Sequence, residues 1–445
     1  MTPRSFNRIS AAGADVQGIA ETSVLVKVDD VPADRLWRHP AWPLCRGLAA
    51  VGFGSVHLRG AIDYFDDLAD LLQGARFTQE PGLWFPEAAE HLAPEVEIVI
   101  DVTNDRASKE VCAKLCLARS SHFISLTWDR TWVALACGLP SEAAEFVASV
   151  PEGTQAEPLL PVARVAGGLA LQEALIRAGR VELACPPEPL VVYNAASESR
   201  TGTQPGEGWS DVGIEDAIVD VIGCGGIGVH FLEAFAPLLG RGCELRLFDG
   251  DVVAGENLPA QITYRDGDLG RPKVLAMAES LSEICDSALV IQPFAVPYQQ
   301  RPRNLATSTL RVSCADNWSV RKYANDVSLR DGVPLVDGGS SPIASQVRTF
   351  YPWRTACLEH RILGLAEKAA NEQDAASCAR ASDATLPGTN MICGGMLAAE
   401  GLKALDVEGF GPPSLGTVIY DARFPRRLGV IDSRPSCTHQ HMRGS

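Results

Sequence analysis

The sequence has no run of about twenty apolar residues, the length that a membrane-spanning helix requires. Its first ten residues, MTPRSFNRIS, also lack the apolar core of a secretory signal peptide. Acidic residues outnumber basic ones, and the formal charge of −16 disfavours binding to nucleic acid or anionic membranes. These absences predict a cytoplasmic protein whose partners are proteins, peptides or small molecules, with no nucleic acid and no membrane among them.

Cysteines occur in an odd number, thirteen, and are scattered along the chain. This pattern argues against a disulfide framework and indicates free thiols or metal ligands, most of the thiols being small buried core residues. Hydrophobic residues make up 46% and charged residues 21%, as in globular proteins. Because 445 residues exceed one ordinary hydrophobic core, we expect two domains.

The most informative stretch of the chain runs from Ile218 to Asp251. A predicted strand, Ile218–Ile222, leads into a glycine loop, an amphipathic helix and a second strand, Leu245–Phe248. Glycines let backbone amides and a helix N-terminus approach a polyphosphate, and the acid about twenty residues further on, Asp249, can hold a ribose hydroxyl. The pattern predicts a nucleotide site, with ATP and NAD both open. The loop glycines are Gly223, Gly225, Gly226 and Gly228.

Pro237 stands inside the helical pattern that follows the glycine loop. That pattern continues through an apolar stripe that includes Phe231, Phe235 and Leu239. An interior proline removes a backbone hydrogen bond, so we expect a kink or an early end of the helix there.

A segment rich in Ser, Gly, Thr and Pro divides the chain near residues 195–213. Four sequence patterns recur in the same order on both sides of it, the clearest being a strand, helix and strand that begin at Val96 and at Leu310. An internal duplication explains the shared order. The first half has no glycine loop after its strand Ser23–Val28, and Asn104 stands in the place of Asp316. We therefore expect one nucleotide-binding half and one partner-shaped scaffold.

Several separated motifs of the second half together resemble the ThiF/MoeB/HesA superfamily, the adenylating domains of ubiquitin-activating-type enzymes. The resemblance implies a Rossmann-like α/β adenylation fold, duplicated into an intramolecular pseudo-dimer. Its parts would be an inactive half at 1–196, a linker at 197–213 and an active half at 214–445. A dehydrogenase would share only the glycine loop and the acid, so NAD is disfavoured. The motifs are GCGGIG at 223–228, FDGDVVAGENLPAQ at 248–261, GRPKV at 270–274, CADN at 314–317 and PLVDGG at 334–339.

The same resemblance implies a role for each matching residue. The four glycines would line the phosphates, and an arginine of the N-terminal segment would reach into the site. Simpler roles are open as well: a solvated lysine on its helix, a helix N-cap for Asp316 and Asn317, and a solvated N-terminal arginine. The implied residues are Asp249 on the ribose, Asp251 beside it, Asn257 and Gln261 around the triphosphate, Lys273 on the phosphates, Asp316 on Mg²⁺ and the arginine Arg8.

The sequence departs from the family pattern at Ala260, where an arginine usually precedes the glutamine of the N-L-x-R-Q run. A cation that would touch the triphosphate is therefore missing. Arg265, Arg271 and Arg321 are the candidates to replace it. The alternative is that the second half is a decayed site, and that the protein is a scaffold that presents a peptide to another enzyme.

Members of the superfamily commonly hold a structural zinc ion with two cysteine pairs. At the matching places this chain has Cys357 with His360, and Cys437 with His439, two thiols and two imidazoles that suit tetrahedral Zn²⁺. The alternative is a helix-capping His360 and a loose C-terminal tail. Cys378 stands where some members carry a thioester- or persulfide-forming cysteine, with an incidental loop cysteine as the alternative.

Taken together, these motifs predict an enzyme with ATP and Mg²⁺ as cofactors and a structural Zn²⁺ as a further candidate. It would adenylate the C-terminal carboxylate of a ubiquitin-like or sulfur-carrier protein, or of a ribosomally made peptide. The acyl-adenylate would pass to a thiol, sulfur or amine acceptor, so a downstream acceptor enzyme is a candidate partner. The attack of one anion on another explains why such a site needs metal and cationic side chains arranged beforehand.

Overall fold

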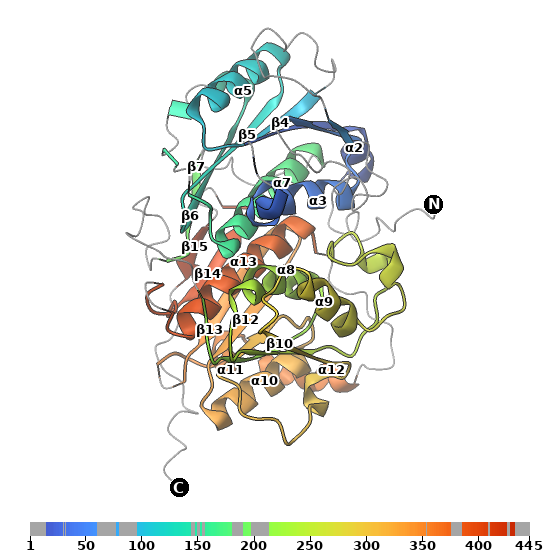
Figure 1. Cartoon of the computed structure of the whole chain (residues 1–445), viewed down its shortest axis with the longest axis vertical. Coiled ribbons are helices and arrows are strands. Elements are labelled where there is room, and N and C mark those ends of the chain that lie inside the picture. The colour runs from blue at the N-terminus through green and yellow to red at the C-terminus, as the bar shows by residue number, and fades with distance from the viewer. Residues whose placement is uncertain are drawn as a thin grey trace.

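The computed structural model of the chain has two β-sheets that lie one above the other (Figure 1). Helices fill the space between the sheets and also cover their two outer faces (Figure 1). The first sheet uses residues 23–194 and the second uses residues 218–431. The structure describes residues 15–29, 31, 33–59, 77–79, 96–143, 147–148, 152–153, 156–179, 190–196, 213–352, 354–374, 385–407, 410–424 and 428–431.

The first sheet has seven strands in the order β3-β2-β1-β4-β5-β6-β7. Pairing is parallel from β3 to β5 and antiparallel from β5 to β7. Helix α5 covers the outer face, while α3 and α7 lie on the side of the second half (Figure 1). The bounds are α2 Val16–Glu21, β1 Ser23–Val28, α3 Ala41–Val51, β2 Ser55–Arg59, β3 Phe77–Gln79, β4 Val96–Val102, α5 Arg106–Arg119, β5 His122–Trp128, β6 Trp132–Gly138, α7 Leu160–Ala178 and β7 Leu190–Asn194.

The second sheet has eight strands in the order β10-β9-β8-β11-β12-β13-β14-β15. Its first five strands are parallel and its last three pairings are antiparallel. The bounds are β8 Ile218–Ile222, α8 Gly226–Phe235, β9 Glu244–Phe248, α9 Lys273–Ser282, β10 Val290–Phe294, β11 Leu310–Ser313, α10 Trp318–Asp331, β12 Leu335–Ser340, β13 Ala344–Phe350, α11 Leu358–Arg361, α12 Leu365–Asp374, α13 Pro387–Ala404, β14 Thr417–Asp421 and β15 Leu428–Ile431.

The two sheets share one topology. In each half the first strand, β1 or β8, has the second strand, β2 or β9, on one side and the fourth strand, β4 or β11, on the other. This crossover at the centre is the Rossmann arrangement, in which ligands bind outside the carboxyl ends of the strands. The second sheet adds one antiparallel edge strand, β15. The expected Rossmann-like α/β fold in duplicate is therefore confirmed.

Pro237 ends the helix that follows the glycine loop. Helix α8 stops at Phe235, and the chain continues as a 3-10 turn over Ala236–Leu238. The expected early end is confirmed. The apolar stripe was predicted to run on to Leu239 within one helix, and this is wrong, because Leu239 lies beyond the turn in extended backbone.

The described cysteines are free thiols, and all of them except Cys285 are buried. Burial raises the pKa of Cys45 to about 12 and keeps it protonated at neutral pH. Cys224 and Cys393 are fully enclosed near the glycine loop and on α13. The prediction of small buried core thiols is confirmed for this part of the chain.

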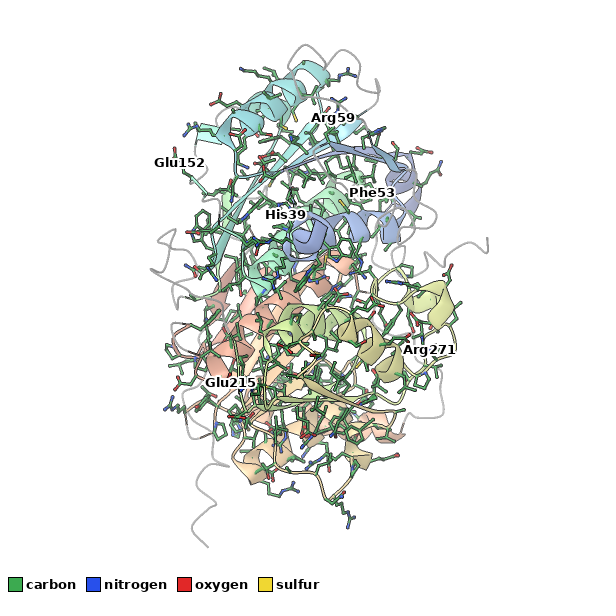
Figure 2. All side chains as sticks on the ribbon, viewed as in Figure 1. His39, Phe53, Arg59, Glu152, Glu215 and Arg271 are labelled. Carbon is green, nitrogen blue, oxygen red and sulfur yellow. The ribbon has the colours of Figure 1, made fainter. Side chains whose placement is uncertain are left out.

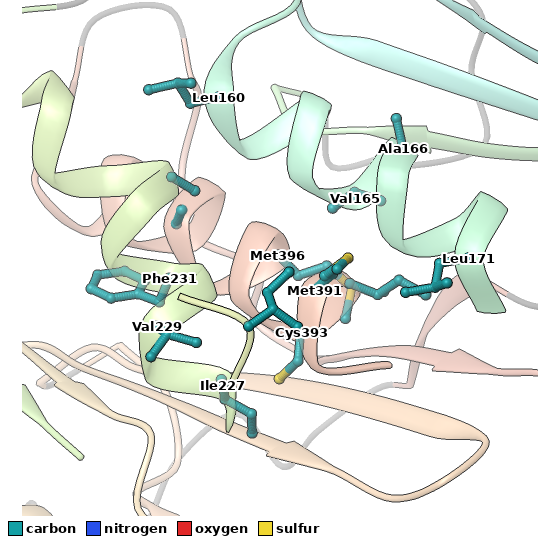
Figure 3. Packing of buried hydrophobic residues seen from close by; sticks show 14 of the residues in the cluster. Leu160, Val165, Ala166, Leu171, Ile227, Val229, Phe231, Met391, Cys393 and Met396 are labelled. Atoms are coloured by element: carbon teal, nitrogen blue, oxygen red, sulfur yellow. The ribbon is translucent and has the colours of Figure 1, made fainter. Parts of the chain in front are cut away.

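Helices α7 and α13 form the centre of the contact between the halves (Figure 3). Every residue of α13 is buried, and so is every residue of α7 except Arg177. The backbones approach closely because glycines face the partner helix. A Cβ on Gly395 would lie 2.6 Å from Cγ2 of Val165, and one on Gly168 would lie 2.8 Å from Cβ of Met391. Although both helices are largely apolar, no helix in the described part is long and apolar enough to cross a membrane.

We expect Gly395→Ala to lower the free energy of unfolding by about 1–3 kcal/mol, because the added methyl group overpacks the contact with Val165. Urea unfolding followed by tryptophan fluorescence measures the change. Gly267→Ala is the matched control, since a Cβ at Gly267 meets no atom within 4 Å. Equal stability of the two variants would show that α7 and α13 do not need close backbone contact.

Candidate functional site

The glycine loop joins β8 to α8, and two of its glycines are required by the backbone. Gly223 has φ +98°, a left-handed conformation that glycine adopts without strain. A Cβ on Gly228 would lie 2.1 Å from the carbonyl oxygen of Gly223. A side chain at Gly228 would push the helix away from the loop, and one at Gly223 would strain the backbone. Backbone conformation and packing therefore account for two of the four predicted glycines.

The other two glycines differ in the space around them. A Cβ on Gly226 would lie 2.5 Å from Nδ2 of Asn390 on α13. Around Gly225, the atom nearest to such a Cβ is Nε2 of Gln261, at 3.8 Å. No side chain caps the start of α8 at Gly225 in the described part of the chain. The amides of this first turn are thus available to an anionic group on the open side of Gly225.

Asp249 holds the glycine loop from the end of β9. Its carboxylate accepts hydrogen bonds from the amide of Cys224 at 2.7 Å and from the amide of Asp251 at 2.8 Å. Burial raises the pKa of Asp249 above its ordinary value, while Lys273 and the two amides oppose this rise. The sequence predicts a ribose-binding role for this residue. The structure shows a second role that the sequence did not predict: the Asp249 carboxylate holds the backbone of the glycine loop through Cys224.

Lys273 is the first residue of α9 and is paired with Asp251. Its Nζ lies 2.8 Å from Oδ2 of Asp251, and its backbone amide donates to the Asp251 carbonyl oxygen at 3.0 Å. The lysine side chain is 7% exposed, so the alternative of a solvated helix residue is wrong. The Asp251 side chain is 73% exposed, and water can replace its cationic partner. Lys273 can therefore exchange this carboxylate for a phosphate.

Residues 257–264, here called the crossover segment, lie between β9 and α9 and include Asn257 and Gln261. Oδ1 of Asn257 accepts from the amide of Ala254 at 3.2 Å, which closes the short turn Gly255–Asn257. Oε1 of Gln261 is buried and has no hydrogen-bond partner among the described residues. A buried acceptor without a partner, close to the open side of Gly225, fits a polar ligand at this place.

Ala260 is buried, at 3% exposure, and none of the three candidate arginines is bonded to the glycine loop within the described ranges. Arg321 is buried and donates to both carboxylate oxygens of Asp337 at 2.9 Å. Arg271 is part of an exposed ion-pair group toward the outer edge of the second half (Figure 2). Arg265 lines a cavity between the halves. Within the described residues, none of these three arginines therefore replaces the missing cation by direct contact with the glycine loop.

Asp316 was expected to hold a metal ion or to cap a helix, and in the structure its neighbour Asn317 is the cap. Oδ1 of Asn317 accepts from the amide of Val320 at 2.8 Å and caps α10. The Asp316 side chain is exposed, and no described residue donates a hydrogen bond to it. Nε of Arg321 donates to the carbonyl oxygen of Ala315 at 2.9 Å and holds the preceding backbone. The Asp316 carboxylate is therefore available to a metal ion.

Cys357 and His360 lie close together at the start of α11. Sγ of Cys357 is 3.3 Å from Nδ1 of His360. Two ligands of one tetrahedral zinc ion, each about 2.0–2.3 Å from the metal, are separated by roughly 3.5 Å, so the pair fits half of a zinc site. Among the described residues no group of three or more such ligands is present. The other predicted ligands, Cys437 and His439, lie outside the described residues, as do Arg8 and Cys378.

The first half has a different chemistry at the matching edge of its sheet. Nδ2 of Asn104 donates to the carbonyl oxygen of Trp128 at 3.0 Å, and its Oδ1 accepts from the Trp128 amide at 2.9 Å. Nζ of Lys109 is buried and bonds to Asp101 at 2.7 Å. Asp29 follows β1, where the second half has its glycine loop, and burial raises the pKa of Asp29 to about 6. These groups bond to each other and to the backbone.

Two contributors to the second-half site were missed in the sequence. The Tyr264 hydroxyl donates to the carbonyl oxygen of Cys224 at 2.7 Å and so ties the crossover segment to the glycine loop. Asn390 packs against Gly226, and its Oδ1 accepts from the Ser340 hydroxyl at 2.6 Å. The sequence offered one signal for Asn390, which is a polar residue near the start of the apolar stretch that forms α13.

The chain matches the ThiF family over residues 212–436, which contain the second sheet and the described site residues. It is 30% identical over 217 residues to the molybdopterin-synthase adenylyltransferase of Salmonella typhimurium, covering 47% of this chain and 80% of that protein. It is also 30% identical over 214 residues to the sulfur carrier protein adenylyltransferase of Thermus thermophilus, covering 47% of this chain and 76% of that protein.

Among solved structures, the crystal structure of E. coli MccB with ATP aligns with 51% of this chain and 66% of its own chain. The TM-score is 0.41 and the sequence identity is 19%. The match to the ThiF family spans 225 of the 445 residues, from 212 to 436, and a relative at 30% identity is covered over 80% of its length. The chain therefore belongs to the ThiF family.

Proposed function

We propose that residues 214–445 bind Mg-ATP and adenylate the C-terminal carboxylate of a protein or peptide. Residues 1–196 would act as an inactive adenylation-like partner half, joined through residues 197–213. The observation that carries this proposal is the grouping of an open glycine loop, a lysine on an exchangeable carboxylate and an exposed aspartate. They follow the neighbouring strands β8, β9 and β11, at the edge where Rossmann sheets bind ligands.

In the proposed reaction a carboxylate oxygen of the substrate attacks the α-phosphorus of ATP. A carbon–oxygen–phosphorus linkage forms, the bond to the β-phosphate oxygen breaks, and pyrophosphate leaves with its electron pair. The amides at the start of α8 would bind phosphate oxygens, and Lys273 would leave Asp251 to pair with the phosphates. Asp316 would hold Mg²⁺, which offsets the negative charge that gathers as two anions meet.

A carboxylate at the C-terminus of a protein or peptide is the proposed substrate class. The Thermus relative is named as an adenylyltransferase of a sulfur carrier protein, which supports a sulfur-carrier or ubiquitin-like substrate. A ribosomally made peptide offers the same chemical group. The acceptor would be a thiol, sulfur or amine, either Cys378 of this chain or a group on a partner enzyme.

A second candidate function follows from Ala260, which leaves the crossover segment without the cation expected from the resemblance. In that case the chain would bind a peptide and present it to another enzyme. ATP–[³²P]pyrophosphate exchange with C-terminal peptides separates the two functions. Exchange that depends on peptide supports adenylation, whereas peptide binding with neither ATP binding nor exchange supports the scaffold.

We expect Asp316→Asn to slow peptide-dependent pyrophosphate exchange by at least about 100-fold, because the amide binds Mg²⁺ poorly. The exchange rate at saturating ATP, over a range of Mg²⁺ concentrations, measures the loss. Asp326→Asn is the control, since Asp326 lies on α10, the helix that follows Asp316, and its carboxylate pairs with Lys322 and accepts a hydrogen bond from Asn325. Full exchange by Asp316→Asn would remove this residue from the metal site.

We expect Lys273→Met to raise the KM for ATP by about 10- to 100-fold, the range for losing one hydrogen bond to a charged group. Stability should change little, because the partner left behind, Asp251, is mostly exposed. The measurement is exchange as a function of ATP concentration, with urea unfolding alongside. Lys322→Met, at a half-buried lysine on α10, serves as the control. An unchanged KM would assign Lys273 to structure alone.

We expect the purified protein to contain about one zinc ion per chain, held by Cys357, His360, Cys437 and His439. Elemental analysis by mass spectrometry measures the content. Cys357→Ser should lose the metal and unfold at lower temperature, whereas Cys285→Ser, a half-buried thiol elsewhere, should keep it. Metal-free protein with full thermal stability would exclude a structural zinc site.

A further inference from the structure

Glu233 is a buried carboxylate on α8, two turns beyond the glycine loop. It lies 3.0 Å from Nη1 of Arg46 and 2.7 Å from Nη2 of Arg164, both from the first half. It also accepts from the Thr263 hydroxyl at 2.7 Å. Burial alone would raise the pKa of Glu233, but Arg46 and Arg164 lower it below its ordinary value. The carboxylate is therefore charged and binds the two halves together.

Arg46 makes a second bond that Arg164 does not make. Its Nη2 donates to the carbonyl oxygen of Ile262 at 2.9 Å. The guanidinium thus spans two points of the second half, one on α8 and one on the backbone of the crossover segment. A planar guanidinium can bond in two directions at once, whereas an ammonium group offers a single compact charge.

The crossover segment contacts the candidate nucleotide site on both sides of Ile262. Gln261 lies beside the open glycine Gly225 and has a buried oxygen without a partner in the described part. On the other side, Tyr264 donates its hydroxyl hydrogen to the Cys224 carbonyl oxygen within the glycine loop. A shift of the Ile262 backbone would therefore move Gln261 and loosen the loop together.

Packing around this contact is incomplete. A cavity of about 70 Å³ lies between the halves and is lined by Trp37, Trp42, Arg46 and Thr263, among others. This space is partly open and large enough to hold water. The position of the crossover segment therefore depends on hydrogen bonds as well as on packing. The bond from Arg46 to the Ile262 carbonyl oxygen is one of them.

We propose that Arg46 is a positioning residue through which the first half sets the geometry of the nucleotide site in the second half. It acts through the Ile262 carbonyl oxygen, and Gln261 and Tyr264 transmit the position to the phosphate-facing loop. The catalytic consequence rests on the proposed function. The structural consequence, an ordered crossover segment, does not.

Two conservative variants test the proposal, because the chain supplies a matched pair. Arg46→Lys keeps the charge beside Glu233 and loses the bond to Ile262. Arg164→Lys changes the same residue type, on the same carboxylate and in the same half, but removes no bond to the crossover segment. Urea unfolding of both variants establishes that each remains folded.

The first readout is hydrogen exchange of the full chain, measured by mass spectrometry on peptides that contain the crossover segment. The amides of Ala260, Gln261 and Tyr264 are bonded within this segment and report its opening. We expect exchange about tenfold faster in Arg46→Lys and within about twofold of wild type in Arg164→Lys. Equal protection of the segment in the two variants would overturn the positioning role.

The second readout is the dependence of pyrophosphate exchange on ATP concentration. We expect the KM for ATP to rise at least about fivefold in Arg46→Lys and to stay within about twofold in Arg164→Lys. Equal shifts in both variants would assign Arg46 to general stability and overturn the proposal. If the wild-type protein catalyses no pyrophosphate exchange, the proposed function fails. The hydrogen-exchange measurement still decides whether Arg46 orders the crossover segment.

Discussion

The rest of the structure depends on the burial of α7 against α13. Both helices are enclosed along nearly their whole length, so neither could face water without exposing a long apolar surface. Each sheet alone would cover only one side of its helix. The contact also includes polar bonds, such as the one from Nε2 of Gln172 to the Pro342 carbonyl oxygen at 3.0 Å. The half without a glycine loop thus covers an apolar surface of the other half.

This contact also positions the glycine loop. Helix α13 packs against α7 on one side and against α8 on the other. A Cβ on Gly394 would lie 2.7 Å from the His230 side chain on α8, and Asn390 of α13 touches Gly226. Such contacts leave no free space, so neither α13 nor α8 can shift without displacing the other. Glu233 of α8 extends this connection to Arg46, so the first half is linked to the loop through side chains as well as through packing.

Local features of the site could be predicted from the sequence, and distant contacts could not. The strand Ile218–Ile222 and the loop glycines are encoded by neighbouring residues, and both lie where expected. Lys273 was open to two interpretations because its partner Asp251 is 22 positions away and its burial depends on the fold. The pair of Arg46 and Glu233 is separated by 187 positions, and no spacing rule connects them. The contacts that the sequence could not predict are therefore those between residues far apart in the chain, above all the contacts between the two halves.

The same topology gives two sheet edges with opposite availability, and a few side chains make the difference. In the first half, Asn104 is bonded to the backbone of Trp128, and Lys109 is enclosed with its carboxylate, so a phosphate would have to break buried bonds. In the second half, Asp316 is exposed, and the partner of Lys273 is already in water. Exchange of one exposed carboxylate for another anion costs little. Ligand binding at such an edge thus depends on which ion pairs the fold leaves at the surface.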